Sequence, residues 1–196
     1  LAIAVIPFLY LIKGEKQKFP FIQSSNKEDL LEKNSINLPE KEKLLELEKL
    51  ATTQGSGIGF DSLFGKWKFV TVWKKGHEDE DSIFSLLLRL FSANLQLKES
   101  LSIDNPLKFS ISVSIHLGIV SIEFSGNAYL KGNQPLFPFF FNLIELKSGS
   151  SVLLSKSLEE PPEKEKSFFA LIGSGENGNW LSARGQGGAL ILWLKD

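Results

Sequence analysis

The stretch KFSISVSIHLGIVSIEFSGNAYL, residues 108–130, decides the fold of this chain. In its first half apolar and polar residues alternate, and this period of two residues is typical of a half-buried β-strand. The apolar set is Phe109, Ile111, Val113 and Ile115, and the polar set is Ser110, Ser112, Ser114 and His116. The alternation resumes after Gly118, which predicts a turn. We therefore expect a hairpin with its apolar side in a core, while its serine side faces either water or a polar cavity inside the barrel.

Short segments of the same kind recur along the second half of the chain, and Gly and Asn punctuate the intervals. Besides a strand that begins at Gly65, we expect strands at residues 94–98, 139–146, 151–154, 168–172, 180–183 and 189–195. About eight or nine short strands without helices between them are typical of an antiparallel barrel or sandwich. Residues 82–91, SIFSLLLRLF, interrupt the pattern, and periodicity does not decide between a helix at a barrel mouth and a fully buried strand.

Residues 24–54 form a charged, helix-forming lead-in. Asn37 and Pro39 mark the start of a helix in which one apolar stripe recurs at helical spacing. The stripe consists of Leu44, Leu47, Leu50 and Ala51. A helix of this kind lies on another element with its charged face in water. We therefore divide the chain into an apolar segment (1–23), the helical lead-in (24–54) and a β-barrel domain (55–196).

The first twelve residues, LAIAVIPFLYLI, form an uninterrupted apolar run that ends at Lys13. A helix needs about 20 apolar residues to span a bilayer, so the run is too short alone. Because the sequence has no Met at position 1, we expect the run to be the end of a longer span or of a cleaved targeting sequence. The alternative is a buried strand or short helix that packs on the domain.

The segment FGKWKFVTVW, residues 64–73, places a Gly-x-Trp at the start of a strand. In a barrel, Trp67 can fill the tapered end, and Gly65 lets the backbone turn tightly before it. A cation from the last hairpin can then lie flat on the indole and bond to carbonyl groups of the closing turn. Arg184 is our candidate for that cation, so Gly65, Trp67 and Arg184 are the expected barrel-closing residues.

These motifs resemble the plastid lipid-associated protein family, the fibrillins. Gly65-Lys66-Trp67 is similar to the Gly-x-Trp signature of lipocalin-type barrels, and ARGQGGALILWLK, which begins at Ala183, resembles the end of fibrillin sequences. The resemblance covers residues 41–195. It implies a mainly β fold, an antiparallel lipocalin-like β-barrel preceded by a short helical segment. It also implies a non-enzymatic protein of plastid or cyanobacterial thylakoid membranes, with a lipid, a carotenoid or another isoprenoid as the class of ligand.

The composition argues against several other functions. A net charge of -1 gives no basic excess for nucleic acid, and the absence of Cys excludes disulfides and thiolate chemistry. His77 lies in an acidic turn, HEDED, without the glycine spacing of a calcium loop. His116 is too far along its strand from Ser112 or Ser114 for a nucleophile and base pair. We interpret GSGENG, residues 173–178, as a turn, and we expect no catalytic residue and no metal site.

The segment LFPFFFNLIEL, residues 136–146, is the most aromatic part of the chain. If its residues alternate between the two sides of a sheet, both sides carry aromatic surface, and one of them needs a ligand, a bilayer or a protein partner. The expected membrane or partner surface consists of Phe137, Phe139, Phe140 and Phe141. The alternative is that the lead-in helix covers the outer side.

Two functional hypotheses follow. In the first, the barrel binds a lipid or isoprenoid at a photosynthetic membrane. In the second, the barrel has a filled interior and serves as a structural accessory subunit of a membrane complex such as a photosystem. The two hypotheses differ in whether the interior of the barrel holds a ligand or is filled by side chains.

Overall fold

The computed structural model describes residues 37–76, 93–100, 108–131 and 136–196, and it is mainly β. The helix α2 (Lys41–Gln54) and the short 3-10 turn η2 (Asp61–Leu63) precede the sheet. A second 3-10 turn, η3 (Glu163–Glu165), lies in the connection between β6 and β7. The strands are β1 (Gly65–Trp73), β2 (Asn94–Glu99), β3 (Lys108–Leu117), β4 (Val120–Tyr129), β5 (Leu136–Ser148), β6 (Ser151–Ser157), β7 (Ser167–Ser174), β8 (Trp180–Gly185) and β9 (Leu190–Lys195). The predicted mainly β, barrel-like fold with a preceding helix is confirmed. The predictions for residues 1–23, for the first part of the lead-in (24–36), and for residues 77–81 and 82–91 lie outside the described residues.

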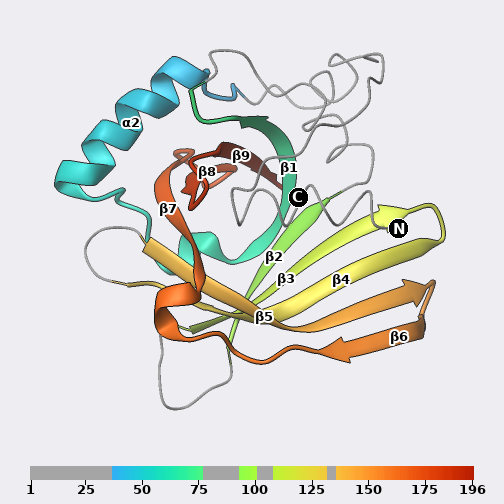
Figure 1. Cartoon of the computed structure of the whole chain (residues 1–196). Helices are drawn as coiled ribbons and strands as arrows, with labels where there is room; N and C mark the ends of the chain where they lie inside the picture. Colours follow the sequence, from blue (N-terminus) through green and yellow to red (C-terminus); the bar gives the residue numbers. More distant parts are fainter. Residues whose placement is uncertain (1–36, 77–92, 101–107, 132–135) are drawn as a thin grey trace.

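All strand pairs are antiparallel, and the sheet closes on itself (Figure 1). The strand order is β4-β3-β2-β1-β9-β8-β7-β5-β6, and β4 also pairs with β5. Every strand except β6 therefore has a neighbour on both sides. Ring closure removes the exposed strand edges of the ring, and β6 remains as a branch on β5.

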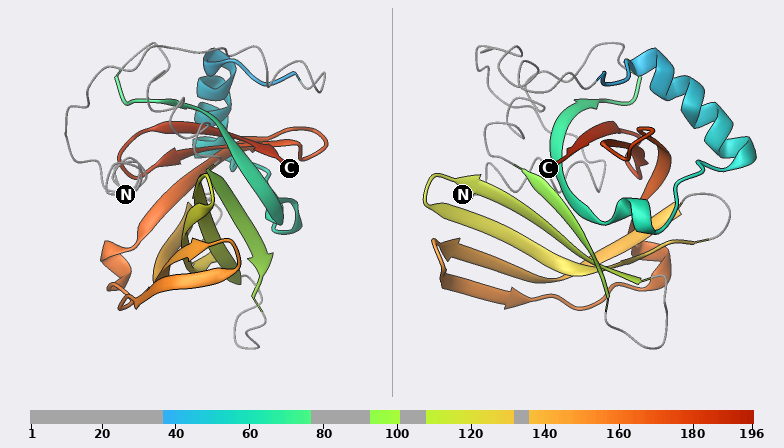
Figure 2. Two further views of the ribbon diagram at one scale, coloured as in Figure 1. Left: turned by 90° about the vertical axis from the view of Figure 1, so that its right-hand side faces the viewer. Right: turned by 180° about the vertical axis from the view of Figure 1, so that it is seen from behind.

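Strand β5 has three partners. One of its edges pairs with β4 from Phe139 to Ser148. Its other edge pairs first with β7, over residues 136–139, and then with β6, over residues 143–148. The sheet therefore divides along β5. In Figure 1 and in the right-hand view of Figure 2, the hairpins β3–β4 and β5–β6 project together away from the small ring formed with β1, β7, β8 and β9.

The alternation in β3 has the predicted sense. Phe109, Ile111, Val113 and Ile115 are buried in the main core, whereas Ser110 and His116 are exposed. The register continues this pattern across the hairpin, where Ile115 is opposite Ile122 and Val113 is opposite Phe124. The serine side of the hairpin therefore faces outward, which favours water over a polar cavity as its surroundings.

Helix α2 packs on the outside of the ring, across β7 (Figure 1). Its Leu44 is fully buried in a second apolar cluster with Ile172, Leu190 and Leu192. Ala51 is also buried, but Leu50 is 49% exposed, so the prediction that Leu50 belongs to the buried stripe is wrong. Leu50 is one residue before Ala51, which already occupies the buried side of that turn.

A register shift lies between Ser125 and Gly126 in the β4–β5 pair. At this position the two backbones approach so closely that a Cβ on Gly126 would lie 1.9 Å from the carbonyl oxygen of Phe140. The missing side chain of Gly126 therefore allows the pairing of β4 with β5 to continue past the bulge.

Gly126→Ala should destabilise the protein by about 1–3 kcal/mol, because the new methyl group collides with backbone rather than with a movable side chain. The control is Gly59→Ala, where a Cβ would meet nothing within 4 Å. Urea unfolding should show a change under about 0.5 kcal/mol for the control. Equal stability of the two variants would contradict this account of the bulge.

Candidate functional site

The closed end of the barrel holds two of the three predicted closing residues. Trp67 is fully buried, and its indole N–H donates a hydrogen bond to the carbonyl oxygen of Leu63, at 2.9 Å. Gly65 has a φ of 135°, where residues with a side chain are strained, and a Cβ there would lie 2.8 Å from Cε of Lys195. Gly65 therefore makes room for the side chain that covers Trp67.

The cation over Trp67 is Lys195, whose Nζ lies 5.1 Å from the ring centroid. The prediction that Arg184 lies on Trp67 is wrong. Arg184 points to the outer side of β8, where its Nε donates to Glu48 of α2 at 2.7 Å and its Nη2 donates to the same carboxylate. Its Nη1 donates to the carbonyl oxygen of Gly188 at 3.0 Å, so the expected bond to the closing turn is present. Arg184 thus fastens α2 to the last hairpin.

The register of the first and last strands explains why Lys195, and not Arg184, lies over Trp67. Trp67 is directly opposite Lys195 in the β1–β9 pair. Arg184, in contrast, follows Ala183, whose side chain belongs to the main core with Trp67. Because successive residues of a strand point to opposite faces, Arg184 faces away from that core.

A double-mutant cycle tests this assignment. Trp67→Leu and Lys195→Ala should couple by about 0.5–1 kcal/mol, the size of a cation–π contact near the surface. Trp67→Leu combined with Arg184→Ala should be additive within about 0.5 kcal/mol, because the two side chains share no partner. Both cycles are measured by urea unfolding. A larger coupling for Arg184 than for Lys195 would favour Arg184 as the cation that closes the barrel.

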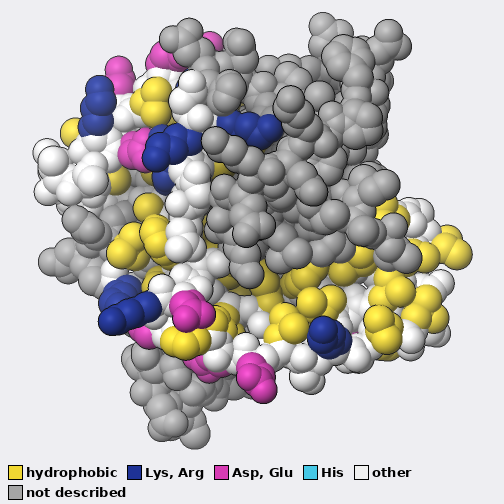
Figure 3. Space-filling model, in the orientation of Figure 1, with side chains coloured by type: hydrophobic (Ala, Val, Ile, Leu, Met, Phe, Trp, Pro, Cys, Tyr) yellow, Lys and Arg dark blue, Asp and Glu magenta, His cyan; other side chains and the backbone are white. Residues whose placement is uncertain are grey.

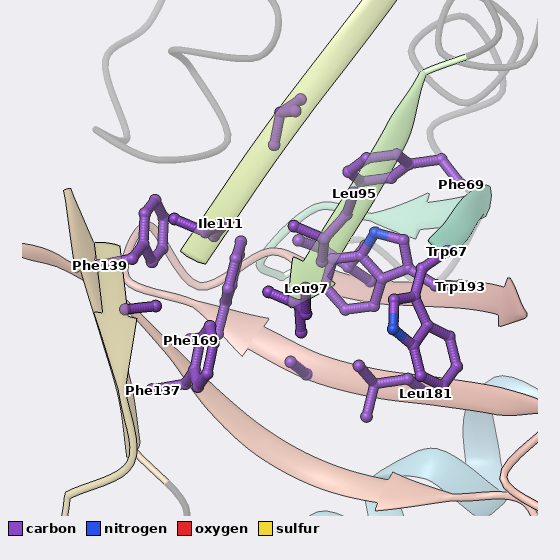
Figure 4. Close-up of a cluster of buried hydrophobic side chains, with 14 of the residues drawn as sticks. Trp67, Phe69, Leu95, Leu97, Ile111, Phe137, Phe139, Phe169, Leu181 and Trp193 are labelled. Carbon is purple, nitrogen blue, oxygen red and sulfur yellow. The ribbon is translucent and has the colours of Figure 1, made fainter. Parts of the chain in front are cut away.

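The space inside the ring is filled by large apolar side chains (Figure 4). Trp193 packs against Phe69 and Phe169, with ring centroids 5.3 Å and 5.5 Å apart. A cavity of about 10 Å³ remains, lined only by apolar side chains such as Leu95, Leu181 and Trp193. This volume holds one water molecule at most, and the apolar lining offers it no partner.

The aromatic segment of β5 does not form the expected surface. Phe137 and Phe139 are 1% and 2% exposed, so their assignment to a membrane or partner surface is wrong. Phe139 stacks on Phe169 at 4.8 Å, and Phe141 packs on the same core against Phe124 at 5.6 Å. The three alternate residues Phe137, Phe139 and Phe141 share the inner face of the sheet.

Phe140 is the aromatic residue of this run on the outer face, and a lysine covers it. Nζ of Lys166 lies 5.0 Å from the centroid of Phe140 and 5.5 Å from that of Tyr129. The same ammonium group pairs with Glu160 at 2.7 Å and with Glu163 at 3.0 Å. We call this group, Tyr129, Phe140, Glu160, Glu163 and Lys166, the Lys166 clasp. It holds the connection between β6 and β7 against the outside of the barrel.

Charge in the clasp shifts the pKa of its groups. The Tyr129 hydroxyl donates to Glu163, and this bond, followed by the bond from Lys166, lowers the pKa of the Glu163 carboxyl from 4.5 to about 2. Burial and then the bond to Glu163 raise the pKa of Tyr129. The two carboxylates also raise the pKa of Lys166. Tyr129, Glu160, Glu163 and Lys166 thus pair with one another, which is typical of a structural ion network.

The stability of the protein should fall in acid partly through Glu163. Because its pKa is lower in the folded chain than in the unfolded chain, its contribution is complete above about pH 4.5 and disappears as the pH falls toward 2. In urea unfolding between pH 6 and pH 2, Glu163→Gln should have a shallower pH dependence than the wild type. Glu165→Gln, an exposed neighbour in η3, is the control and should keep the wild-type slope. An unchanged slope for Glu163→Gln would show that the clasp does not form.

His116 is exposed on the outer face, opposite Ser121, and no group of three metal-ligating side chains occurs in residues 37–76, 93–100, 108–131 and 136–196. Residues 175–179 connect β7 to β8 as a turn, in which the amide of Gly175 donates to the carbonyl oxygen of Trp180 and that of Gly178 to the carbonyl oxygen of Gly175; Gly173 and Ser174 of the predicted turn belong to β7. Two of the backbone amides of the turn are therefore used within it.

No family model, curated protein or solved structure matches this chain. The resemblance to fibrillins stays a prediction. In the part of the chain that the structure describes, no helix is long and apolar enough to cross a bilayer.

Proposed function

We propose that this chain is a non-enzymatic structural module, an accessory subunit that docks through its surface to a complex of a photosynthetic membrane such as a photosystem. Of the two hypotheses from the sequence, the filled ring favours this one over an interior that carries a lipid or isoprenoid.

The size of the interior carries the proposal. Sites for organic ligands typically have volumes of about 300–1,000 Å³, whereas the cavity that the described residues line inside the ring has about 10 Å³. The residues that line it include Phe137, Phe169 and Trp193, which are held by aromatic neighbours on several strands. Opening such a core costs about 3–5 kcal/mol for each large aromatic side chain removed from it. The free energy gained on binding a ligand would have to exceed the cost of opening the core.

The charged side chains at the surface act within the fold and do not indicate a nucleic-acid partner. The ion pairs of Lys166 and of Lys147 hold elements of the fold together, and the Arg184–Glu48 pair holds α2. With a net charge of -1, the chain offers no basic excess for nucleic acid. The photosynthetic membrane in the proposal rests on the resemblance of the Gly-x-Trp and Arg-Gly motifs to those of fibrillins.

Purification from native membranes tests the proposal. After mild solubilisation the protein should migrate with a large complex, and organic extraction of the separated protein should yield less than one lipid or pigment per chain. The same extraction of the complex without this chain is the control. A lipid or isoprenoid bound at one per chain, in protein that is free of the complex, would overturn the proposal and support the carrier hypothesis.

A further inference from the structure

Two hairpin turns lie side by side at the projecting end of the sheet. Residues 117–121 join β3 to β4, and residues 148–155 join β5 to β6 and begin β6. The amide of Gly149 donates a hydrogen bond to the carbonyl oxygen of Ile119, at 3.1 Å, so the two turns are linked into one unit. We call residues 117–121 and 148–155 the hairpin tip.

The hairpin tip has an unusual composition for an exposed turn region. Its sequences, LGIVS and SGSSVLLS, contain no charged residue. Its aliphatic side chains are nevertheless exposed: Ile119 by 81%, Val152 by 51%, Leu153 by 58% and Leu154 by 63%. Within the described residues, the one other large hydrophobic residue exposed to this degree is Leu50 of α2. Figure 3 shows hydrophobic side chains gathered at the end where these hairpins project.

The exposed side chains point in more than one direction. Val152 is opposite Lys147 and Leu154 is opposite Leu146, with a register shift at Leu153 between them. Because Leu146 and Lys147 are successive residues of β5, Val152 and Leu154 face opposite sides of the sheet. All residues of β6 are exposed, because β6 pairs with β5 alone among the described strands. A protein partner seated on one face would leave the other face in water. A lipid layer entered by the tip surrounds both faces.

Charged side chains lie behind Ile119 but level with the β6 part of the tip, since Lys147 is opposite Val152 and Glu145 is opposite Ser155. On the outer face, Lys147 pairs with Glu123 at 2.7 Å and with Glu145 at 2.9 Å, and Lys156 follows on β6. An apolar end followed by a charged collar is the arrangement of a segment that enters the boundary between headgroups and acyl chains. The collar limits how deep the segment enters, because these charges need water or headgroups.

We propose that the hairpin tip inserts into the interfacial layer of a lipid bilayer, with Ile119 and Leu153 among the acyl chains. The inference deepens the proposed function, since it adds a direct lipid contact to docking on a membrane complex. Insertion is apolar rather than electrostatic, because the tip carries no charge. It therefore requires neither anionic lipid nor low salt.

Site-specific labelling gives the direct test, because the chain contains no Cys. The full chain with Ile119→Cys or Leu50→Cys carries a polarity-sensitive fluorophore and is mixed with protein-free vesicles of phosphatidylcholine. Both residues are exposed and aliphatic, so Leu50 is the matched control. Emission from position 119 should shift to the blue on binding and be quenched by spin-labelled lipid. Emission from position 50 should not shift.

A charge in the tip should remove this signal. Leu153→Asp, combined with the label at position 119, should lower the fraction that responds to vesicles at least 10-fold, while Leu50→Asp should leave it unchanged. Concentrated salt should change the wild-type response less than 2-fold. Far-ultraviolet circular dichroism checks that each variant is folded, and Leu153→Ser replaces any Asp variant that is not, with a loss in the same direction.

The outcomes separate the two proposals. Absence of a blue shift at position 119, equal shifts at both positions, or loss of binding in salt would overturn insertion of the tip. If the protein still migrates with the membrane complex in that case, the proposed docking function stands and the contact is with protein. If the tip inserts but the separated protein carries a stoichiometric lipid, the tip inference stands and the filled-barrel function falls.

Discussion

The structure depends on the three-way pairing of β5. Its pairing with β4, the first strand of the order, turns an open sheet into a ring and leaves β6 outside the ring. In an open sheet both end strands would expose unpaired amides and carbonyls. Here one edge of β5 pairs with nearly the whole length of β4, and the other edge pairs with β7 and then with β6. The closed core and the projecting hairpins both follow from this division.

The closed end is built for stability. Aromatic residues from β1, β5, β7 and β9 meet inside the ring, and charges are kept outside it or at its rim. Three cations each hold a different part of the fold, since Lys195 covers Trp67, Arg184 holds α2, and Lys166 holds the connection before β7. These pairs are partly exposed, so each contributes little to the free energy of folding. Their more important effect is to select one position for each connecting segment.

The period-two alternation is sufficient to predict the strands and the inward and outward faces of β3 and β4. The strong alternation of Phe109 with Ser110 leaves no other assignment, since a shift by one residue would bury the serines. The helix before the sheet and the turn between β7 and β8 are equally readable from local sequence. Closure of the ring is expected from the Gly-x-Trp motif, and the motif residues Gly65 and Trp67 do lie together at the closed end.

Partners distant in sequence are not readable in this way. Arg184 is the conspicuous cation near the last strand, which makes it the natural candidate to cover Trp67, but the register gives that place to Lys195. Alternation along β8 places Arg184 on the outer face only if Ala183 is already known to face the core, and the sequence alone does not say which of the two faces inward. Glu48 as the partner of Arg184 depends on where α2 docks, and no local pattern carries that information.

The location of the exposed apolar surface follows from the same distinction between local composition and position in the fold. The aromatic run of β5 is the most hydrophobic feature of the domain, and for that reason the fold buries it: each large side chain moved from water to the core is worth about 1.5–3 kcal/mol. The segment SVLLS, residues 151–155, is less hydrophobic than the aromatic run and contains no aromatic residue. It belongs to β6, which lies outside the ring, so no inner face of the barrel is available to cover it. Exposure is thus set by topology rather than by hydrophobicity, and an aliphatic segment on the branch strand stays in contact with solvent.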